Sequence, residues 1–467
     1  MVCSPRRATA GALGHTLLEM PWPIWAVLDM LVAAAGIVVG YRSFVWTPEG
    51  AWIHVGLAPT CGVLALAIML SGVVFGLYEE QTLLRGSRIL ARSILTVAGA
   101  TTLAYIVISF LMYAMHSRRV LCMAGVVYLA VMPWARLLVC WCVRNYGRKF
   151  LIVGTDRRSI LSVNSQGDAL SRRYRLVGYL GIDPIEIGRE VGGHRVLGTV
   201  DDLEQVCVDQ HIDEVVVGPG AAKNPRVLEK VLGCLNLGCR VTNLSTFCEQ
   251  VLSEVPLAHL EPDWFLFADF KHYRDSQSIM KRTLDVVVSA VVLLLSLPFW
   301  PIIALLIKLD SPGPVFYHQR RVGLNGRIFR IHKFRTMTQT AEANGHMWAV
   351  QDDPRITRVG WYLRRARLDE LPQLWNILIG EMSLVGPRPE RPEFVAHLAR
   401  EIRYYNERHL VKPGLTGWAQ INYRYAASIE DSRRKLQLDL WYIKHMSLEI
   451  DLFILLRTIG TVCLGSR

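Results

Sequence analysis

Two adjacent carboxylates, Asp369 and Glu370, closely follow three arginines at the start of the stretch RRARLDELPQLWNILIGEMSLVGPRPE. Because proline is tolerated in the first turn of a helix, Pro372 predicts a helix that begins just after Asp369. The amino end of a helix favours anions, and so do nearby cations, so we expect both carboxylates to be ionised with lowered pKa values. The cations are Arg364, Arg365 and Arg367. The same surroundings suit a phosphate group.

The expected helix has an apolar face at the spacing i, i+3, i+4, i+7, formed by Leu371, Leu374, Trp375 and Leu378. Gly380 is a typical residue to end such a helix. We expect this face to belong to the core, with no other role.

Asp369 has two interpretations. It can be an N-cap residue that pairs with a neighbouring arginine. It can also be a nucleophile toward phosphorus, as in enzymes with an aspartyl phosphate, while Glu370 holds a divalent metal that neutralises a pyrophosphate. The motif by itself leaves both interpretations open.

Other basic motifs favour a phosphate site. HKFRTM places Lys333 and Arg335 two positions apart, so on a strand they share one face. GPRPE holds Arg388 between two prolines, and VKPGLTGWAQIN combines Lys412 with a Pro-Gly turn. Each motif alone is typical of an ordinary surface, but together they predict a site rich in phosphate contacts.

The elements that position these residues begin with membrane segments. Hydrophobic residues make up 51% of the 467 residues and charged residues 20%, with a mean hydropathy of +0.26, which favours a chain that is part membrane and part soluble. Spanning a bilayer takes about 20 apolar residues. Four segments qualify, and buried helices of a soluble domain are the alternative. They are Pro23–Tyr41, Trp52–Tyr78, Ile94–Met115 and Val120–Val143.

Basic residues before the first span, between the second and third, and after the fourth predict that both ends are cytoplasmic, although Arg118 and Arg119 argue against it. The net charge of +12 suits anionic lipids or phosphorylated substrates. Nucleic acid is not an expected partner, since no zinc-finger or RNA-binding signature occurs. Without a C-x-x-C pair, the ten cysteines are expected to be reduced thiols.

From Arg148 onward, strand-like runs alternate with helical patterns, which predicts a parallel sheet with helices on its faces. The first turn contains Gly154 but lacks G-x-G-x-x-G. We therefore expect a Rossmann-like fold that binds no NAD.

The last domain opens with a charge-free run, Val286–Ile307, interrupted by Pro298 and Pro301. Proline kinks a helix, and basic residues flank both ends of the run. We expect a re-entrant helix, about 283–308, that enters one leaflet and returns, with a kinked spanning helix as the alternative. The expected order is a tail, the four-span region, the Rossmann-like domain, a linker and the last domain, at 1–18, 19–147, 148–262, 263–278 and 279–467.

From Ser278 to the carboxyl terminus, the chain resembles the bacterial sugar transferase family, the polyprenyl-phosphate hexose-1-phosphate transferases or monotopic phosphoglycosyl transferases. The matching blocks are SPGPVFYHQRRVGLNGRIF, KFRTM, DPRITRVGWYLRRARLDELPQLWNIL, GEMSLVGPRPERPEF and VKPGLTGWAQI. The architecture resembles the long subgroup that initiates exopolysaccharides. The end of the chain is most similar to members linked to exosortase-associated systems.

The resemblance implies that Asp369 is the nucleophile and that Glu370 is its partner beside Mg²⁺. It also implies phosphate and nucleotide-sugar contacts by four basic residues, Arg364, Lys333, Arg335 and Arg388. Pro298 would be the break in the re-entrant helix, although a Leu-Pro pair replaces the frequent Ser-Pro. The block QINYR departs from QINGR in many relatives, and this departure concerns sugar specificity.

The expected activity is transfer of hexose 1-phosphate from a UDP-sugar to polyprenyl (undecaprenyl) phosphate, with release of UMP, at the cytoplasmic face of the bacterial inner membrane. Dimerisation through the first two domains is compatible with this interpretation. Two alternatives remain open at this point, a non-catalytic membrane scaffold or nucleotide sensor, and an NAD-dependent sugar epimerase or dehydratase. The missing glycine fingerprint argues against the latter.

Overall fold

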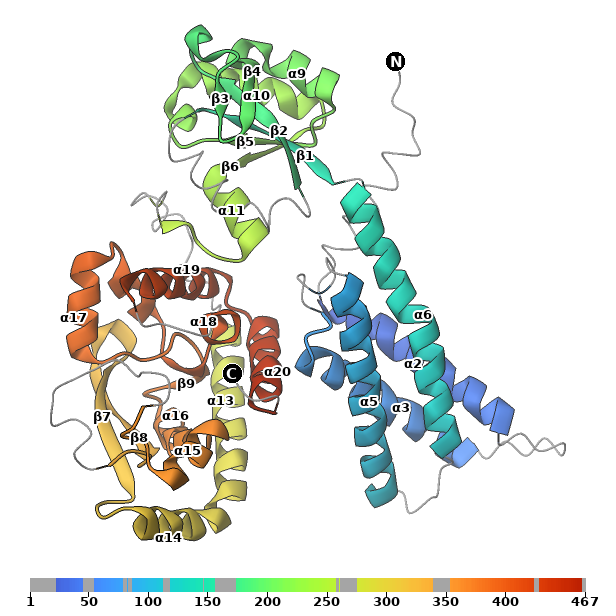
Figure 1. Ribbon diagram of the computed structural model, residues 1–467, viewed down its shortest axis with the longest axis vertical. Coiled ribbons are helices and arrows are strands. Elements are labelled where there is room, and N and C mark those ends of the chain that lie inside the picture. The colour runs from blue at the N-terminus through green and yellow to red at the C-terminus, as the bar shows by residue number, and fades with distance from the viewer. Residues whose placement is uncertain are drawn as a thin grey trace. The chain divides into compact units, whose positions relative to one another are not determined.

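The computed structural model divides the chain into two compact units, residues 1–247 and 248–467 (Figure 1). The expected tail, 1–18, and most of the expected linker, 263–278, lie outside the described residues. The described residues are 22–44, 54–78, 82, 86–111, 118–145, 147–155, 174–257, 260, 275–338, 353–423 and 428–463.

Four apolar helices open the described part of the first unit, as the sequence predicted (Figure 1). Helix α2 packs against α3 and α6, and α5 packs against α3 and α6. Residues 22–43, 87–109 and 119–143 are long and apolar enough to cross a membrane, whereas α3 contributes a shorter apolar stretch, Pro59–Val74. The four helices are α2 (Trp22–Phe44), α3 (His54–Val74), α5 (Gly86–Leu111) and α6 (Arg118–Asn145).

A buried ion pair joins two of these apolar helices. Arg136 Nη2 on α6 donates to Asp29 Oδ2 on α2 at 2.7 Å, and both side chains are fully buried. The Tyr78 hydroxyl donates to the same carboxylate oxygen at 2.8 Å. Charges this deep among apolar helices are costly unless they are paired, so the pair ties α2 to α6.

We expect Asp29→Ala and Arg136→Ala each to destabilise the protein by about 3–5 kcal/mol, because each leaves a buried charge without its partner. The double variant should lose less than the sum of the two single losses. Thermal unfolding of the purified protein in detergent measures all three. If both single variants unfolded at the wild-type temperature, the ion pair would not stabilise the protein.

A six-stranded sheet occupies the described remainder of the first unit, in the order β3-β4-β2-β1-β5-β6. Neighbouring strands are parallel except for β3, which pairs with β4 in the antiparallel sense. The sheet is therefore mixed rather than purely parallel as expected. Its strands are β1 (Arg148–Val153), β2 (Tyr174–Gly181), β3 (Glu190–Val191), β4 (His194–Thr199), β5 (Glu214–Val217) and β6 (Arg240–Asn243).

The apolar residues of β1 and β5 are buried up to the carboxyl end of each strand, as continuous hydrophobic runs of parallel strands usually are. The helices that follow the strands are α9 (Leu203–Gln210), α10 (Pro225–Asn236) and α11 (Leu244–Leu252). Cys207, Cys234 and Cys239 are buried in this core, and burial raises the pKa of each thiol. These three cysteines are free thiols, as expected, and buried thiols of this kind are inert.

A broken apolar helix lies in the second unit. Helix α13 (Asp275–Ser296) ends in a 3-10 turn, Leu297–Phe299, and α14 (Trp300–Asp310) continues in a clearly different direction (Figure 1). The expected break at Pro298 is confirmed, since this proline lies in the turn. By length and composition, residues 278–310 could also cross a membrane.

The rest of the second unit packs helices around two small sheets. Strands β7 (Phe316–Val322) and β8 (Ile328–Phe334) form an antiparallel hairpin, and β9 (Ser383–Val385) and β10 (Gly414–Thr416) form a parallel pair. One hydrophobic core includes Ile331, Leu384 and Leu440. The helices are α15 (Arg358–Arg365), α16 (Gln373–Ile379), α17 (Pro392–Glu401), α18 (Trp418–Asn422), α19 (Ile429–His445) and α20 (Leu448–Cys463).

The expected helix after the acidic pair is confirmed as α16, and Gly380 ends it with a left-handed φ of 92°. Its buried face differs from the prediction. Leu374 is 3% exposed, but Trp375 is 53% exposed and does not belong to the core. The helix begins four residues after Asp369, and Asn376 and Ile377 complete its buried face.

Candidate active site

The acidic pair lies in a 3-10 turn, Leu368–Glu370, between α15 and α16. Arg367 starts the turn in the left-handed region, with φ 57°, and neither this turn nor α16 has a side-chain cap. Asp369 is therefore no N-cap residue in this structure, and that interpretation of its role loses its support. The turn instead presents two buried carboxylates side by side in the sequence.

Glu370 is held by cations. Its Oε1 accepts hydrogen bonds from Lys333 Nζ at 3.1 Å and from Arg388 Nη2 at 3.0 Å. Arg367 Nη1 lies 3.8 Å from the same oxygen. Burial alone would raise the pKa of Glu370, but these positive charges outweigh it and hold the pKa well below its ordinary value. Glu370 is thus ionised across the physiological range.

Asp369 differs from its neighbour. It is only 7% exposed, yet among the described residues its carboxylate has no hydrogen-bond or ion-pair partner. Burial raises the pKa of Asp369, and the charge of Glu370 adds to this effect, although Lys333 and Arg364 oppose it. The expectation of lowered pKa values is confirmed for Glu370 and wrong for Asp369, because the nearest cations bond to Glu370.

Three of the four predicted basic residues surround the pair. Lys333 comes from β8, and Arg388 comes from the loop that follows β9. Arg364 comes from α15, where its Nε donates to Thr336 Oγ1 at 2.9 Å. Burial lowers the pKa of Arg364, and the charge of Asp369 acts in the opposite direction. The structure thus gathers Lys333, Arg364 and Arg388 around the two carboxylates.

The fourth predicted basic residue, Arg335, lies elsewhere. Strand β8 ends at Phe334, so the alternation that would place Arg335 on the face of Lys333 stops one residue too early. The Arg335 guanidinium instead donates to the carbonyls of Pro312 at 2.8 Å and Ser311 at 2.7 Å, just beyond α14. Arg335 therefore fastens the end of the broken apolar helix and does not reach the acidic pair.

We expect Arg335→Ala to lower stability by about 2–4 kcal/mol, because it leaves several buried carbonyls without donors. The variant should retain the substrate affinity of the wild type per folded molecule. Thermal unfolding and a KM measurement on the same preparation separate these effects. A wild-type melting temperature combined with a raised KM would instead show that Arg335 contributes to substrate binding.

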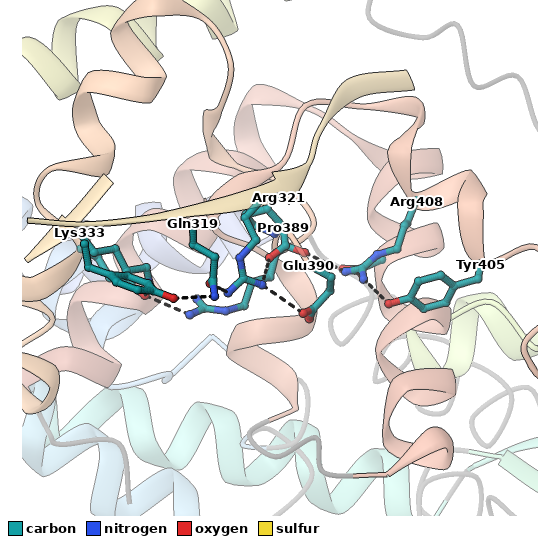
Figure 2. A network of polar contacts seen from close by, with 11 residues as sticks. Gln319, Arg321, Lys333, Pro389, Glu390, Tyr405 and Arg408 are labelled. Carbon is teal, nitrogen blue, oxygen red and sulfur yellow. Dashed lines mark hydrogen bonds and ion pairs between the residues drawn. The ribbon is translucent and has the colours of Figure 1, made fainter. Parts of the chain in front are cut away.

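Sequence reasoning missed Arg321, on the hairpin face that carries Lys333. Arg321 Nη1 donates to the Pro389 carbonyl at 3.0 Å, and its Nη2 donates to Gln319 Oε1 at 2.7 Å. Figure 2 shows these side chains in one row with Lys333. Burial lowers the pKa of Arg321 to about 10, so it remains a cation at neutral pH. Period-two alternation along FYHQRRV could have found it.

Sequence reasoning also missed Arg408, which forms a hydrogen bond with the loop that carries Arg388. It is 5% exposed and donates from Nη2 to Asp439 Oδ2 at 2.7 Å and to the Arg388 carbonyl at 3.1 Å. Its Nη1 donates to the Tyr405 hydroxyl at 2.7 Å (Figure 2). Since these partners come from distant parts of the sequence, no local pattern could have indicated the contact.

Asp369 and Glu370 are the carboxylates that could hold a divalent cation such as Mg²⁺. The cationic contacts of Glu370 go to Oε1, and Asp369 offers a further pair of carboxylate oxygens. No group of three or more acidic, histidine or cysteine side chains suited to a metal occurs in the part of the chain that the structure describes. Mg²⁺ is often bound by one or two carboxylates together with water and substrate phosphates, which is what this pair could supply.

Comparison with known proteins identifies the class. Residues 276–465 match the model of the bacterial sugar transferase family. Over 187 residues, the chain is 40% identical to the exopolysaccharide production protein PSS of Rhizobium leguminosarum bv. phaseoli, covering 39% of this chain and 94% of that relative. The chain belongs to the bacterial sugar transferase family.

Two further relatives are similar over smaller shares of their own length. The UDP-N-acetylgalactosamine-undecaprenyl-phosphate N-acetylgalactosaminephosphotransferase of Aeromonas hydrophila is 47% identical over 40% of this chain and 44% of its own length. The undecaprenyl-phosphate glucose phosphotransferase of Komagataeibacter xylinus is 33% identical over 68% of this chain and 59% of its own length. The chain therefore spans less than two thirds of these relatives.

Proposed function

We propose that the protein transfers hexose 1-phosphate from a UDP-sugar to polyprenyl (undecaprenyl) phosphate, with release of UMP, as a first membrane step of exopolysaccharide synthesis. The observation that carries this proposal is the contrast within the acidic pair. Glu370 is tied to Lys333 and Arg388, while the buried carboxylate of Asp369 has no partner among the described residues. The names of the relatives support the same class of substrates.

The reaction has two displacements at one phosphorus atom. In the first, an Asp369 oxygen bonds to the β-phosphorus of the UDP-sugar, and the bond from that phosphorus to the bridging oxygen breaks. The electron pair of the broken bond leaves with UMP. In the second, an oxygen of the lipid phosphate attacks the same phosphorus and displaces the Asp369 carboxylate, which gives a polyprenyl diphosphate sugar.

The surrounding side chains prepare this chemistry. Burial raises the pKa of Asp369, which makes the ionised carboxylate a stronger base and nucleophile than one in water. Lys333, Arg364 and Arg388 offer positive charge to phosphate oxygens as charge shifts toward the leaving group. When bound by Asp369 and Glu370, Mg²⁺ would supply further neutralisation of the diphosphate charge.

The broken helix α13–α14 supports a location at the membrane surface. Large apolar side chains on it face outward, with Leu294 69%, Leu305 60% and Leu309 75% exposed. Such a surface is unfavourable in water and suits lipid. With the basic residues at both ends of this segment, it supports a re-entrant helix that holds the site at the cytoplasmic face of the inner membrane.

The sheet of the first unit supports a Rossmann-like module without a dinucleotide site. Its strands β2, β1, β5 and β6 are parallel neighbours, and Gly154 follows β1 with φ 107°. The chain lacks the G-x-G-x-x-G fingerprint at this turn, which argues against a bound dinucleotide.

A screen of UMP release tests the proposed function. The purified protein with undecaprenyl phosphate should release UMP from one UDP-sugar or from a few related ones, and a lipid-linked sugar diphosphate should form in equal amount. No UMP from any donor in the panel would reject the proposal and favour a non-catalytic membrane scaffold. The donor that reacts would also identify the transferred sugar.

A further inference from the structure

The face of α19 that is directed toward the site carries Lys435 and Asp439, four residues apart and thus on one side of the helix. Asp439 is 2% exposed and accepts a hydrogen bond from Arg408 at 2.7 Å. Arg408 in turn donates to the carbonyl of Arg388 at 3.1 Å. This chain of contacts packs the Lys435 face of α19 against the loop that presents Arg388 to Glu370.

Lys435 is a half-buried cation without an acceptor. Within the described residues, its ammonium makes no hydrogen bond and no ion pair. Burial lowers the pKa of Lys435, and the positive charges of Arg388 and Arg408 lower it further, while Glu390 opposes them. A desolvated ammonium in such a place is costly unless an anion binds it, which indicates a ligand rather than a structural role.

The charges around Lys435 also favour an anionic ligand. The cations of this neighbourhood are Arg321, Lys333, Arg388, Arg408 and Lys435. The carboxylates that they face are Asp369, Glu370, Glu390 and Asp439. Of the carboxylates near Lys435, Asp439 pairs with Arg408 and Glu390 pairs with Arg321, so neither pairs with the Lys435 ammonium.

Arg388 is common to the surroundings of Lys435 and of the acidic pair, because it donates to Glu370 at 3.0 Å and its charge acts on Lys435. The charges that act on Asp369 are those of Glu370, Lys333, Arg364 and Arg367. Those that act on Lys435 belong to Glu390, Asp439, Arg408 and Arg388 instead. A diphosphate whose β-phosphorus meets Asp369 would extend its other phosphate past Arg388, toward α19.

We propose that Lys435 binds the phosphate of the departing nucleotide, the one bonded to the ribose in the UDP-sugar. This inference rests on the proposed function and adds a residue to the donor site. Lys435 would hold the leaving UMP by charge and hydrogen bonding, and it would make no contact with the polyprenyl phosphate. Its effect should therefore fall on nucleotide affinity.

The test is equilibrium binding of UMP to the purified full-length protein. Lys435→Met keeps the aliphatic stem but removes the charge, and we expect it to weaken UMP binding by about 10- to 100-fold. Lys435→Arg should restore most of the affinity. Arg433→Met is the matched control, because it removes a cation from the same helix whose ion pair among the described residues is with the exposed Glu430, at 3.3 Å.

Steady-state kinetics provide a second test, because a purely structural role of Lys435 would not change the KM of one substrate selectively. Lys435→Met should raise the KM for the UDP-sugar and weaken inhibition by UMP, with the KM for undecaprenyl phosphate unchanged. Lys435→Gln serves if the methionine variant does not fold. UMP affinity equal to the wild type in a folded variant, or equal losses for both substrates, would overturn the assignment. The proposed function would survive that result, because it fails only if the wild type releases no UMP.

Discussion

Asp369→Asn is expected to abolish turnover, with kcat/KM lowered about 10⁴-fold or more, while the protein remains folded. An amide cannot form the bond to phosphorus that the proposed first displacement requires. The substitution also removes a buried charge that has no partner among the described residues, so no structural contact is lost. The melting temperature should therefore equal or exceed that of the wild type. UMP release and thermal unfolding, measured on one preparation, check both parts.

Glu430→Gln is a suitable control for this experiment, because the Glu430 side chain is 83% exposed and its only ion pair in the described chain is with Arg433. It should leave turnover unchanged. Activity of Asp369→Asn within a few-fold of the wild type would remove Asp369 from the chemistry. A variant that loses activity because it unfolds would contradict the contrast between the two carboxylates.

Glu370→Gln is expected to lower both activity and stability, unlike the change at its neighbour. The variant leaves Lys333 and Arg388 beside a neutral amide, and breaking a buried ion pair in this way costs about 3–5 kcal/mol. We expect turnover to fall by about 10²- to 10³-fold, since the displaced cations no longer hold the phosphates in place. A stable variant with wild-type turnover would show that Glu370 is not needed to position Lys333 and Arg388.

The pH profile of the same variant separates charge from position. In the wild type, kcat/KM should fall as the pH drops through the raised pKa of Asp369, because only the ionised carboxylate attacks. The charge of Glu370 contributes to that raised pKa. Its removal should lower the pKa, so the residual activity of Glu370→Gln should persist to lower pH. An acid limb that stays in place or moves to higher pH would contradict this coupling.

Local sequence signals predicted most of the elements. Uninterrupted apolar runs indicated the helices of the first unit, and short buried runs such as EVVV indicated strands of the sheet. Pro298 correctly marked the break between α13 and α14. The antiparallel edge strand β3 was missed, because a pair of residues such as Glu190–Val191 carries no periodicity. Trp375 was misplaced because the buried face of α16 is formed by Gln373, Leu374, Asn376 and Ile377, which leaves Trp375 on the exposed side.

Sequence motifs predicted those site residues whose charge and chemical type limit the roles that they can have. The acidic pair, Lys333 and Arg388 come together in the structure, and their motifs had singled them out. Arg335 was misassigned because strand alternation was extended one residue past the end of β8. Arg408 could not be found, since its contacts with Asp439 and Arg388 depend on packing between segments that are distant in sequence.

The central claim is that Asp369 carries the sugar phosphate between the two substrates. Incubation of the purified protein with its UDP-sugar alone, followed by rapid denaturation and mass spectrometry, tests it directly. We predict a mass increase of one hexose phosphate, located on the peptide with Asp369 and absent from Asp369→Asn. UMP release that occurs only when undecaprenyl phosphate is present, with no adduct on Asp369 at any time, would contradict the account.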